Sequence, residues 1–335
     1  MFTQLVKTIQ VNRVRLAALL CGAAACLSAG GTSMNANAGP QTSAPLEARV
    51  SVNGNSTIVL GEPISLYYSI TNISDDQGVG KGVGIGLGTN ETQWYQLSLT
   101  DEAGRSAQII PDERSLSPRG LHSTGTYFLS PNGHKEDHIA VTKFFQIMHP
   151  GKYNLVVQVH IPYAAGSVTK EASLTSDLES DIKSSNTTLV DRFVFPIMVT
   201  KADPARLEAR ANALREAATA ERYGQKYRAL LDALFSMPEA QAASSWKSLA
   251  NNADRMDAEL IADQLARIHS ITTADLLVQM LDSTKLSADE TSYIKTKINQ
   301  NYNSGDVGLK AHIKSLAANR GIEMSDEVAI PQPSD

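Results

Sequence analysis

Val59 to Asn72 reads V-L-G-E-P-I-S-L-Y-Y-S-I-T-N and predicts a turn followed by a β-strand. Gly61 and Pro63 are residue types that favour a turn. From Ile64 to Thr71, apolar side chains alternate with hydroxyl-bearing ones, which is the period-2 pattern of a strand with one buried face. We therefore expect an inner strand of an antiparallel sheet. Such a strand builds a core and performs no chemistry.

Alternating segments of the same kind recur between Leu46 and Val199, one of them a strand expected from Ile139 to Ile147, and frequent turn signals separate them. One turn, Pro150-Gly151, is followed closely by Tyr153, and a tyrosine at this position often fixes a corner of a sandwich through its hydroxyl. With roughly seven to nine predicted strands, the region resembles an immunoglobulin-like antiparallel β-sandwich. An open barrel is the alternative that the strand pattern leaves.

The composition changes at Asp203-Pro204, where Ala, Leu, Glu and Arg replace Val, Thr and Gly. Asp followed by Pro is a typical helix start, and apolar residues spaced by three and four then predict seven short helices. Further helix starts are predicted at Asp254, at Thr273, at Asp306 and at a capping box of Ser287 with Glu290. Between Asp254 and Asp282, L-I-A-D-Q-L-A-R-I followed by A-D-L-L-V-Q-M-L resembles a HEAT-like repeat. Because the spacing of the helices is irregular, a compact bundle is the alternative.

The predicted fold class is therefore multidomain, all-β plus all-α: an immunoglobulin-like antiparallel β-sandwich followed by an α-helical domain of HEAT-like pairs or a compact bundle. A chain of 335 residues is long enough for two such domains. We expect a signal peptide at residues 1–38, a linker at 39–45 and the sandwich at 46–202, with a long exposed loop at 164–188. The helical domain is expected at 203–322 and a disordered tail at 323–335.

The N-terminal segment has the order of a secretory signal peptide. Three basic residues and no acidic one precede the apolar run Leu16–Gly30, and Ala36-Asn37-Ala38 follows it. At 15 residues the run is shorter than the span of about 20 that crosses a membrane. We expect cleavage after Ala38 and an extracytoplasmic protein, periplasmic or secreted. Ala23-Ala24-Ala25-Cys26 resembles a bacterial lipobox without its usual Leu, so a lipoprotein anchored through Cys26 is the alternative, and membrane contact is expected only in that case.

Charge and cysteine content exclude several kinds of function. The formal net charge of −5 becomes −8 when the three basic residues of the leader are removed, and no basic stripe is available to neutralise phosphates. Nucleic-acid binding is therefore not expected. Both cysteines, Cys21 and Cys26, lie in the leader. A chain cleaved after Ala38 would have no disulfide, no thiol nucleophile and no Cys-ligated zinc.

Glycine occupies every second position from Gly78 to Gly88. Neither the three-residue spacing of a dinucleotide fingerprint nor the five-residue spacing of a P-loop occurs, so a nucleotide site is not predicted. The segment is either a mobile connector, since glycine weakens a strand through backbone entropy, or a strand with one bare face that another molecule can approach closely. Trp94 is expected in the core. The candidate partner surface comprises Gly80, Gly82, Gly84, Gly86 and Trp94.

Two short patterns were weighed as chemical sites. Ser123 stands in G-L-H-S-T-G, but the nucleophile elbow of α/β-hydrolases requires Gly where Leu121 stands. His134 and His138 are the candidate metal ligands, with two carboxylates between them, and Pro131–Gly133 predicts that they lie in a loop. Zinc peptidases place Glu directly after the first His, where this chain has Lys135. We therefore predict no catalytic residue, no metal and no cofactor.

These patterns favour an exported, non-enzymatic binding or scaffold protein that engages another protein or an envelope component. The reason is that two common interaction architectures occur together without a catalytic constellation. Two alternatives stay open. One is an extracytoplasmic hydrolase or metal-dependent enzyme with a site between the domains. The other is an inhibitor or regulator of a protease that uses the loop 164–188 as bait.

Overall fold

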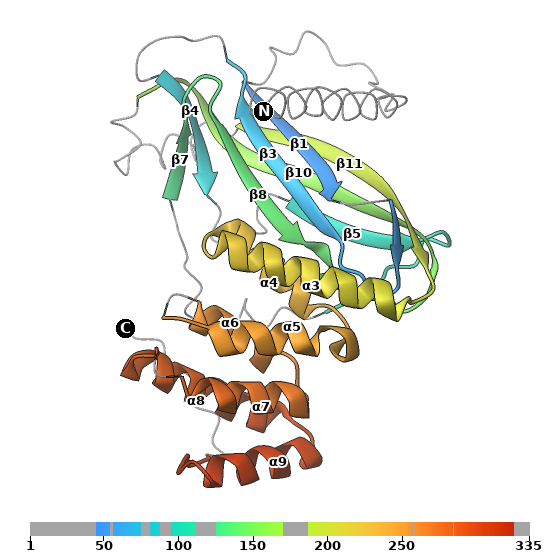
Figure 1. Cartoon of the computed structure of the whole chain (residues 1–335). Coiled ribbons are helices and arrows are strands. Elements are labelled where there is room, and N and C mark those ends of the chain that lie inside the picture. Colours follow the sequence, from blue (N-terminus) through green and yellow to red (C-terminus); the bar gives the residue numbers. More distant parts are fainter. Residues whose placement is uncertain are drawn as a thin grey trace, which may run out of the picture. The chain divides into compact units, whose positions relative to one another are not determined.

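A β region is followed by seven helices in the computed structural model, among the residues that it describes (Figure 1). These residues are 45–53, 56–74, 81–87, 95–110, 125–169, 187–255, 257–283 and 285–324. No helix among them is long and apolar enough to cross a membrane. Several predictions lie outside the described residues: the signal peptide, the lipidation of Cys26, the linker up to residue 44, Gly80, Trp94, Ser123, and the tail from residue 325.

The alternating part of the stretch from Val59 to Asn72 forms the central strand of a three-stranded antiparallel sheet. The strand order is β1 (Leu46–Asn53), β3 (Ser65–Asn72) and β8 (His134–Ala140). The apolar face of β3 is buried, and its members are Leu66, Tyr68 and Ile70. The ring of Tyr68 meets the ring of Tyr95 edge-on at 6.0 Å, which joins this sheet to the larger one. The prediction of an inner strand is thus confirmed.

The larger sheet is organised around one long strand, β10 (Gly151–Thr169). Along one edge of β10 lies β11 (Thr187–Thr200), which in turn pairs with the parallel strand β2 (Thr57–Val59). The other edge pairs first with β5 (Tyr95–Asp101) and then with β4 (Lys81–Leu87), which is itself followed by β7 (Gly125–Leu129). Pro162 lies at the change from β5 to β4, where a missing N–H costs little.

Three strand predictions need correction. The proposed loop 164–188 is too long, because β10 continues to Thr169 and β11 begins at Thr187, and residues 170–186 lie outside the described residues. The mobile-connector interpretation is wrong for Lys81–Leu87, which forms β4 with partners on both sides. A single strand across Ile139–Ile147 is also wrong. A 3₁₀ turn, Val141–Lys143, separates β8 from β9 (Phe145–Gln146), which pairs with β6 (Gln108–Ile109).

The glycine-rich segment forms the strand β4 because the side chains on its non-glycine face are buried. Val83 and Ile85 are both buried, so the apolar contacts of two side chains offset the entropy that the glycines lose. The tyrosine corner, by contrast, is confirmed: the Tyr153 hydroxyl donates to the His149 carbonyl at 2.8 Å.

The helices begin where side-chain caps satisfy free backbone N–H groups. Asp203 accepts from the N–H groups of Ala205 and Arg206, and Ser287 with Glu290 forms the predicted capping box. The bounds are α3 (Pro204–Glu221), α4 (Gln225–Phe235), α5 (Glu239–Asn252), α6 (Ala258–Ala266), α7 (Ile271–Met280), α8 (Ala288–Ser304) and α9 (Val307–Ala318).

Two predicted helix starts are wrong by a few residues. Asp254 does not cap α6; its own N–H donates to the carboxylate of Asp257 at 2.7 Å, and the helix begins after Asp257. Thr273 is the third residue of α7, and Ser270 is the cap. In both places a second Asp or a Ser a few residues away competes for the cap position.

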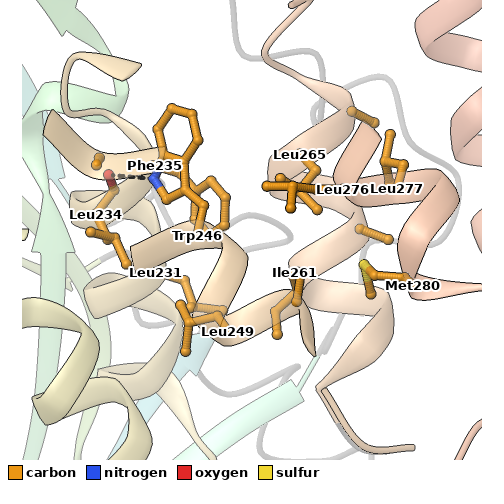
Figure 2. Close-up of a cluster of buried hydrophobic side chains, with 14 of the residues drawn as sticks. Leu231, Leu234, Phe235, Trp246, Leu249, Ile261, Leu265, Leu276, Leu277 and Met280 are labelled. Carbon is orange, nitrogen blue, oxygen red and sulfur yellow. Dashed lines mark hydrogen bonds between the residues drawn. The ribbon is translucent and has the colours of Figure 1, made fainter. Parts of the chain in front are cut away.

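The helices pack on neighbours one and two places along the chain: α3 contacts α4 and α5, α5 contacts α7, α6 contacts α8, and α7 contacts α9. Figure 2 shows the apolar cluster between them, in which Trp246 donates its indole N–H to the Leu234 carbonyl at 3.2 Å. The Trp246 ring also stacks on Phe235, with centroids 5.3 Å apart. Val59 and Ala140 of the β region belong to the same cluster, and Pro45–Asp335 forms one compact unit.

The turn that opens the stretch from Val59 packs directly on the helices. Gly61 has a positive φ of 91°, and a Cβ built there would lie 2.7 Å from Cγ of Pro238, just before α5. Glycine is therefore required twice over, by its backbone conformation and by the close approach of the proline ring.

We expect Gly61→Ala to lower the free energy of unfolding by about 2 kcal/mol or more, since the left-handed conformation alone costs roughly 1 kcal/mol and the contact with Pro238 adds strain. Urea denaturation of the purified protein measures this. Gly104→Ala is the matched control, because Gly104 also has a positive φ, 76°, but has open space around its Cα. Equal losses in the two variants would contradict the close contact between the turn and α5.

Candidate functional site

A groove of about 820 Å³ lies where the β region meets the helices. One side is formed by the turn after β2 and by the segment Phe145–Met148; the other is formed by the C-terminal end of α4, the start of α5 and the C-terminal end of α6. The turn is held in place by the hydrogen-bonded strand β2 and by Pro238. The two sides are joined at 2.9 Å by the hydroxyls of Thr142 and Ser236.

The walls of the groove are mostly apolar. Phe145, Phe235 and Met237 are buried and present one surface to it, while Met148 is 51% exposed at its rim. Apolar walls of this kind bind a ligand by removing water from both surfaces. Methionine side chains are flexible and adapt to differently shaped apolar groups. The groove therefore suits an apolar occupant.

A buried cluster of charges forms one part of the groove lining. Nζ of Lys143 lies 3.4 Å from Oδ2 of Asp232, and both side chains are almost fully buried. Oδ1 of Asp232 accepts from the Gln264 side-chain amide at 2.6 Å, and Nη1 of Arg267 lies 4.0 Å away. The Lys143 ammonium also lies 5.2 Å from the centre of the Phe144 ring. Lys143 and Asp232 thus offset each other's charge, as burial requires, and Arg267 is a second cation beside the same carboxylate.

This arrangement links the 3₁₀ turn Val141–Lys143 to α4 and α6. Oδ2 of Asp232 lies beside the Lys143 ammonium, and Oδ1 accepts from the Gln264 amide. Within the described ranges, no group of three or more His, Cys, Asp or Glu side chains lies close enough to hold a metal ion. What the groove offers is an apolar surface with internally paired charges.

A second set of polar contacts, made by Glu62 and Arg206, covers the edge of β2 beside the groove. The carboxylate of Glu62 accepts the N–H of Val59 at 3.0 Å, and the guanidinium of Arg206 donates to the carbonyl of Thr57 at 3.1 Å. Arg206 and Glu62 also form an ion pair at 2.8 Å. Together the two side chains occupy two of the hydrogen-bonding groups that β2 turns away from β11, and the Val59 carbonyl accepts from the N–H of Glu62. These contacts oppose pairing of this edge with a further strand.

The two candidate metal ligands lie in β8, not in a loop as predicted. His134 and His138 are four residues apart along an extended strand, which separates them by roughly 13 Å. The structure does not bring them together. The His134 ring lies 3.6 Å from the Glu136 carboxylate, whereas the His138 ring packs against Tyr67 of the neighbouring strand at 5.2 Å. The strand forms because β8 pairs with β3 over its full length.

His138 makes the stability of the protein depend on pH. Desolvation lowers the pKa of His138 below its usual value of 6.5, the positive charge of Lys226 lowers it further, and Glu136 and Glu221 oppose the shift. A histidine with a lowered pKa contributes stability above its unfolded pKa, and that contribution is lost as the pH falls through the folded pKa.

We expect the free energy of unfolding to fall more steeply between about pH 7 and pH 5 in the native protein than in His138→Gln. Urea denaturation at a series of pH values measures the slopes, and His134→Gln, at an exposed position of the same strand, is the control. An NMR titration in which His138 has a pKa at or above 6.5 would contradict the prediction.

Of the candidate partner surface, Gly82, Gly84 and Gly86 are the members that the structure describes. They lie in β4, paired with β10 on one side and β7 on the other. Gly84, for example, lies opposite both Ala164 and Phe128. The register between β10 and β4 shifts at Ser167 and Val168, opposite Gly82. Gly84 thus has a paired strand on both sides, whereas Gly82 is paired with β10 only and Gly86 with β7 only.

The residues of the groove were missed by the sequence analysis. Asp232 lies inside L-L-D-A-L-F and Lys143 inside V-T-K-F-F, so each is a single charge within an apolar run. That isolation is a signal for a buried charge, since such a residue is rarely buried without a partner. Sequence spacing could not show that the two charges pair, because their contact depends on how the helices pack on the β region.

No protein-family model and no curated protein matches the sequence. Among solved structures, PapD-like domain 7 of human CEP192 is 16% identical over 52% of this chain and 100% of that chain, with a TM-score of 0.25. Spo0M, a sporulation control protein from Bacillus subtilis, is 11% identical over 53% of this chain and 56% of its own, with a TM-score of 0.24. The CARDB domain of the Pyrococcus furiosus PF1109 protein, solved with di-metal ions, is 11% identical over 46% and 89%, with a TM-score of 0.20. At these TM-scores the likenesses define neither a family nor a function.

Proposed function

We propose that this chain is an exported, non-enzymatic binding protein that holds an extended, mainly apolar segment of a partner protein in the groove between its β region and its helices. The observation that carries the proposal is the apolar groove of about 820 Å³. Its volume is in the range of about 300–1,000 Å³ that is usual for ligand sites.

The proposal includes an immunoglobulin-like sandwich and a HEAT-like stack of helical pairs. The contact between Tyr68 and Tyr95, from different sheets, supports the first. Contacts between helices two places apart, such as α5 with α7 and α7 with α9, support the second, because stacked repeats contact their neighbours in this way. Both architectures commonly serve as supports for binding surfaces.

An extended peptide segment is the occupant whose chemistry fits. The apolar walls match alternate side chains of such a segment, and the neutral amides of Gln146 and Gln241 supply donors and acceptors for its backbone. A highly charged ligand fits less well, because Asp232 and Lys143 already neutralise each other. Binding of this kind uses apolar burial and hydrogen bonds from the chain itself, so the proposal includes no cofactor.

Export and cleavage after Ala38 are proposed from the leader pattern. The mass of the protein purified from its native host tests both. A chain that begins at Gly39 supports secretion or a periplasmic location, and an acylated chain that begins at Cys26 would replace the soluble form with a lipoprotein.

Peptide binding by the purified protein tests the groove. A library of eight-residue peptides is screened by fluorescence polarisation, and Met148→Glu is expected to weaken the best binder by about tenfold, because it places a charge at the apolar rim. Val307→Glu is the matched control, since Val307 is 86% exposed on α9 and does not line the groove. Equal affinity in both variants would overturn the proposal for this site. Turnover of ester, peptide or glycoside substrates would overturn its non-enzymatic part.

A further inference from the structure

One long strand edge of the larger sheet has no hydrogen-bonded strand among the residues that the structure describes, although β1 of the smaller sheet lies close to β11. β11 pairs with β10 on one side, over Thr187–Val199. On its other side it pairs with β2, but only at Met198–Thr200. The segment Thr188–Val194 is therefore hydrogen-bonded on one side only within the described ranges. An unpaired edge of this length is a template for strand addition.

The backbone groups that point outward from this edge can be assigned by parity. The N–H of Met198 donates to Ser56 and the carbonyl of Thr200 accepts from Leu60, so even-numbered residues of β11 face away from β10. Because the direction alternates along a strand, the groups of Thr188, Val190, Arg192 and Val194 face the open edge. Pro196 has the same parity, and its missing N–H ends the series beside β2.

On the inner face of β11, side chains are more buried where β2 pairs with the strand than where the edge is unpaired. Where β2 lies alongside, Ile197 and Val199 are 3% and 2% exposed. Where the edge is open, Leu189, Phe193 and Phe195 are only half-buried. Val190 and Val194, on the outer face, are 62% and 45% exposed. A strand added beside Thr188–Val194 would thus complete the burial of large apolar side chains.

The two edges on this side of the sheet are treated differently. The edge of β2 is blocked by the side chains of Glu62 and Arg206, whereas in the described part of the chain no side chain is hydrogen-bonded to the outward groups of Val190 and Val194. Soluble proteins normally protect such edges against pairing. The contrast indicates that a partner strand can pair with the edge of β11 more readily than with the edge of β2.

Charge adds a preference for the sequence of the added strand. Asp191 lies in the open segment, near Glu47 of β1, and desolvation together with the negative charge of Glu47 raises its pKa. The carboxylate of Glu47 is paired with exposed Arg49. A cationic side chain opposite Asp191 would relieve the repulsion between the two carboxylates.

We propose that the edge Thr188–Val194 binds an extended segment of a partner protein by strand addition, and that this segment alternates apolar residues and carries a Lys or Arg opposite Asp191. A second copy of this chain is the competing occupant: antiparallel self-pairing centred on residue 191 or 192 places like charges opposite each other, whereas pairing centred on Val190 or Phe193 does not, so the oligomeric state is part of the test. The surface is separate from the groove and does not depend on the function proposed for it.

The probe is a synthetic eight-residue peptide of alternating Thr and Val with a central Lys, labelled for fluorescence polarisation. Two further peptides, one with Glu in place of Lys and one N-methylated on alternate amides, test charge and backbone pairing. We expect the Lys peptide to bind, the Glu peptide to bind about tenfold more weakly, and the N-methylated peptide not to bind. Amide hydrogen exchange of Val190 and Val194 is expected to slow in the complex.

Val194→Pro removes one outward N–H without touching the ladder to β10, as Pro196 does naturally. We expect it to weaken the Lys peptide about tenfold, whereas Val194→Thr, which keeps the N–H, binds like the native protein. If Val194→Pro does not fold, Asp191→Lys at an exposed position is the second variant, and it is expected to reverse the preference to the Glu peptide. Unchanged binding in these variants, or no binding of the Lys peptide to the native protein, would overturn the proposal. A native protein that dimerises while Val194→Pro stays monomeric would overturn the choice of a heterologous partner.

Discussion

Replacing Asp232 with Asn is expected to lower the free energy of unfolding by about 3–5 kcal/mol, because removing one partner of a buried ion pair leaves the other charge buried and uncompensated. Asn has the same shape as Asp and can still accept from Gln264, so the loss reports charge and not volume. Lys143 would remain nearly fully buried without its anion, and Arg267 would lose the same neighbour. Urea denaturation at constant pH measures the change.

The control for this prediction is an ion pair at the surface. Arg320 and Asp282 form a two-bond pair at 2.6 and 3.2 Å, but the Asp282 side chain is largely exposed. Asp282→Asn is expected to cost no more than about 1 kcal/mol, since water screens and replaces an exposed pair. Similar losses in Asp232→Asn and Asp282→Asn would contradict the buried placement of the Lys143 and Asp232 side chains.

A double variant separates pairing from burial. Lys143→Met combined with Asp232→Leu removes both charges and keeps their approximate volume. Its stability is expected to lie much closer to that of the native protein than either single variant, because apolar side chains replace buried ion pairs at little cost. The same variant makes the groove lining more apolar. If the groove holds an extended apolar segment, peptide affinity should be retained in the double variant.

The elements that the sequence predicted are those determined by residues close together in the chain. The alternation around Tyr68 defines β3, and Asp203, Ser287 and Asp306 begin three helices at the predicted positions. Each depends on a side chain and a backbone group within a few residues, so spacing along the sequence is sufficient. The tyrosine corner at Tyr153 is local in the same sense.

The features that were predicted wrongly or missed depend on distant contacts. The glycines of β4 weaken any local preference for a strand, and pairing with β10 and β7 decides the outcome. His134 and His138 were placed in a loop because Pro131 and Gly133 precede them, yet the whole of β8 pairs with β3. The groove requires the turn at Gly61 to meet Pro238, and no local pattern shows that contact.

The turn after β2 combines features that depend on neighbouring residues with features that depend on distant contacts. The sequence predicts its glycine and proline as turn residues, but the close approach of Gly61 to Pro238, just before α5, gives the turn its second role as a wall of the groove. Glu62, in the same turn, caps the edge of β2 together with Arg206 of α3. One short segment therefore ends a strand, attaches the β region to the helices and prevents strand addition at that place.

Trp246→Ala is expected to lower the free energy of unfolding by about 3–5 kcal/mol, the usual cost of removing a large buried aromatic side chain. Trp246 is fully buried in the cluster of Figure 2, stacks on Phe235 and donates to the Leu234 carbonyl. Trp246→Phe keeps most of the apolar contact and loses the hydrogen bond, so its expected cost is smaller, about 1–2 kcal/mol. Denaturation by urea gives both values.

Trp246→Ala also tests whether the groove wall depends on the cluster behind it. Phe235 lines the groove on one side and lies against Trp246 on the other, so the cavity left by Trp246→Ala removes the support of the groove wall. We expect affinity for the groove peptide to fall in Trp246→Ala and to be largely kept in Trp246→Phe, while binding of the Lys peptide to the edge of β11 is unchanged in both. Val307→Ala, at an exposed site on α9, should alter stability by no more than about 0.5 kcal/mol. A Trp246→Ala variant that unfolds like the native protein, or loses both binding activities together, would contradict the role of this tryptophan as the support of the groove alone.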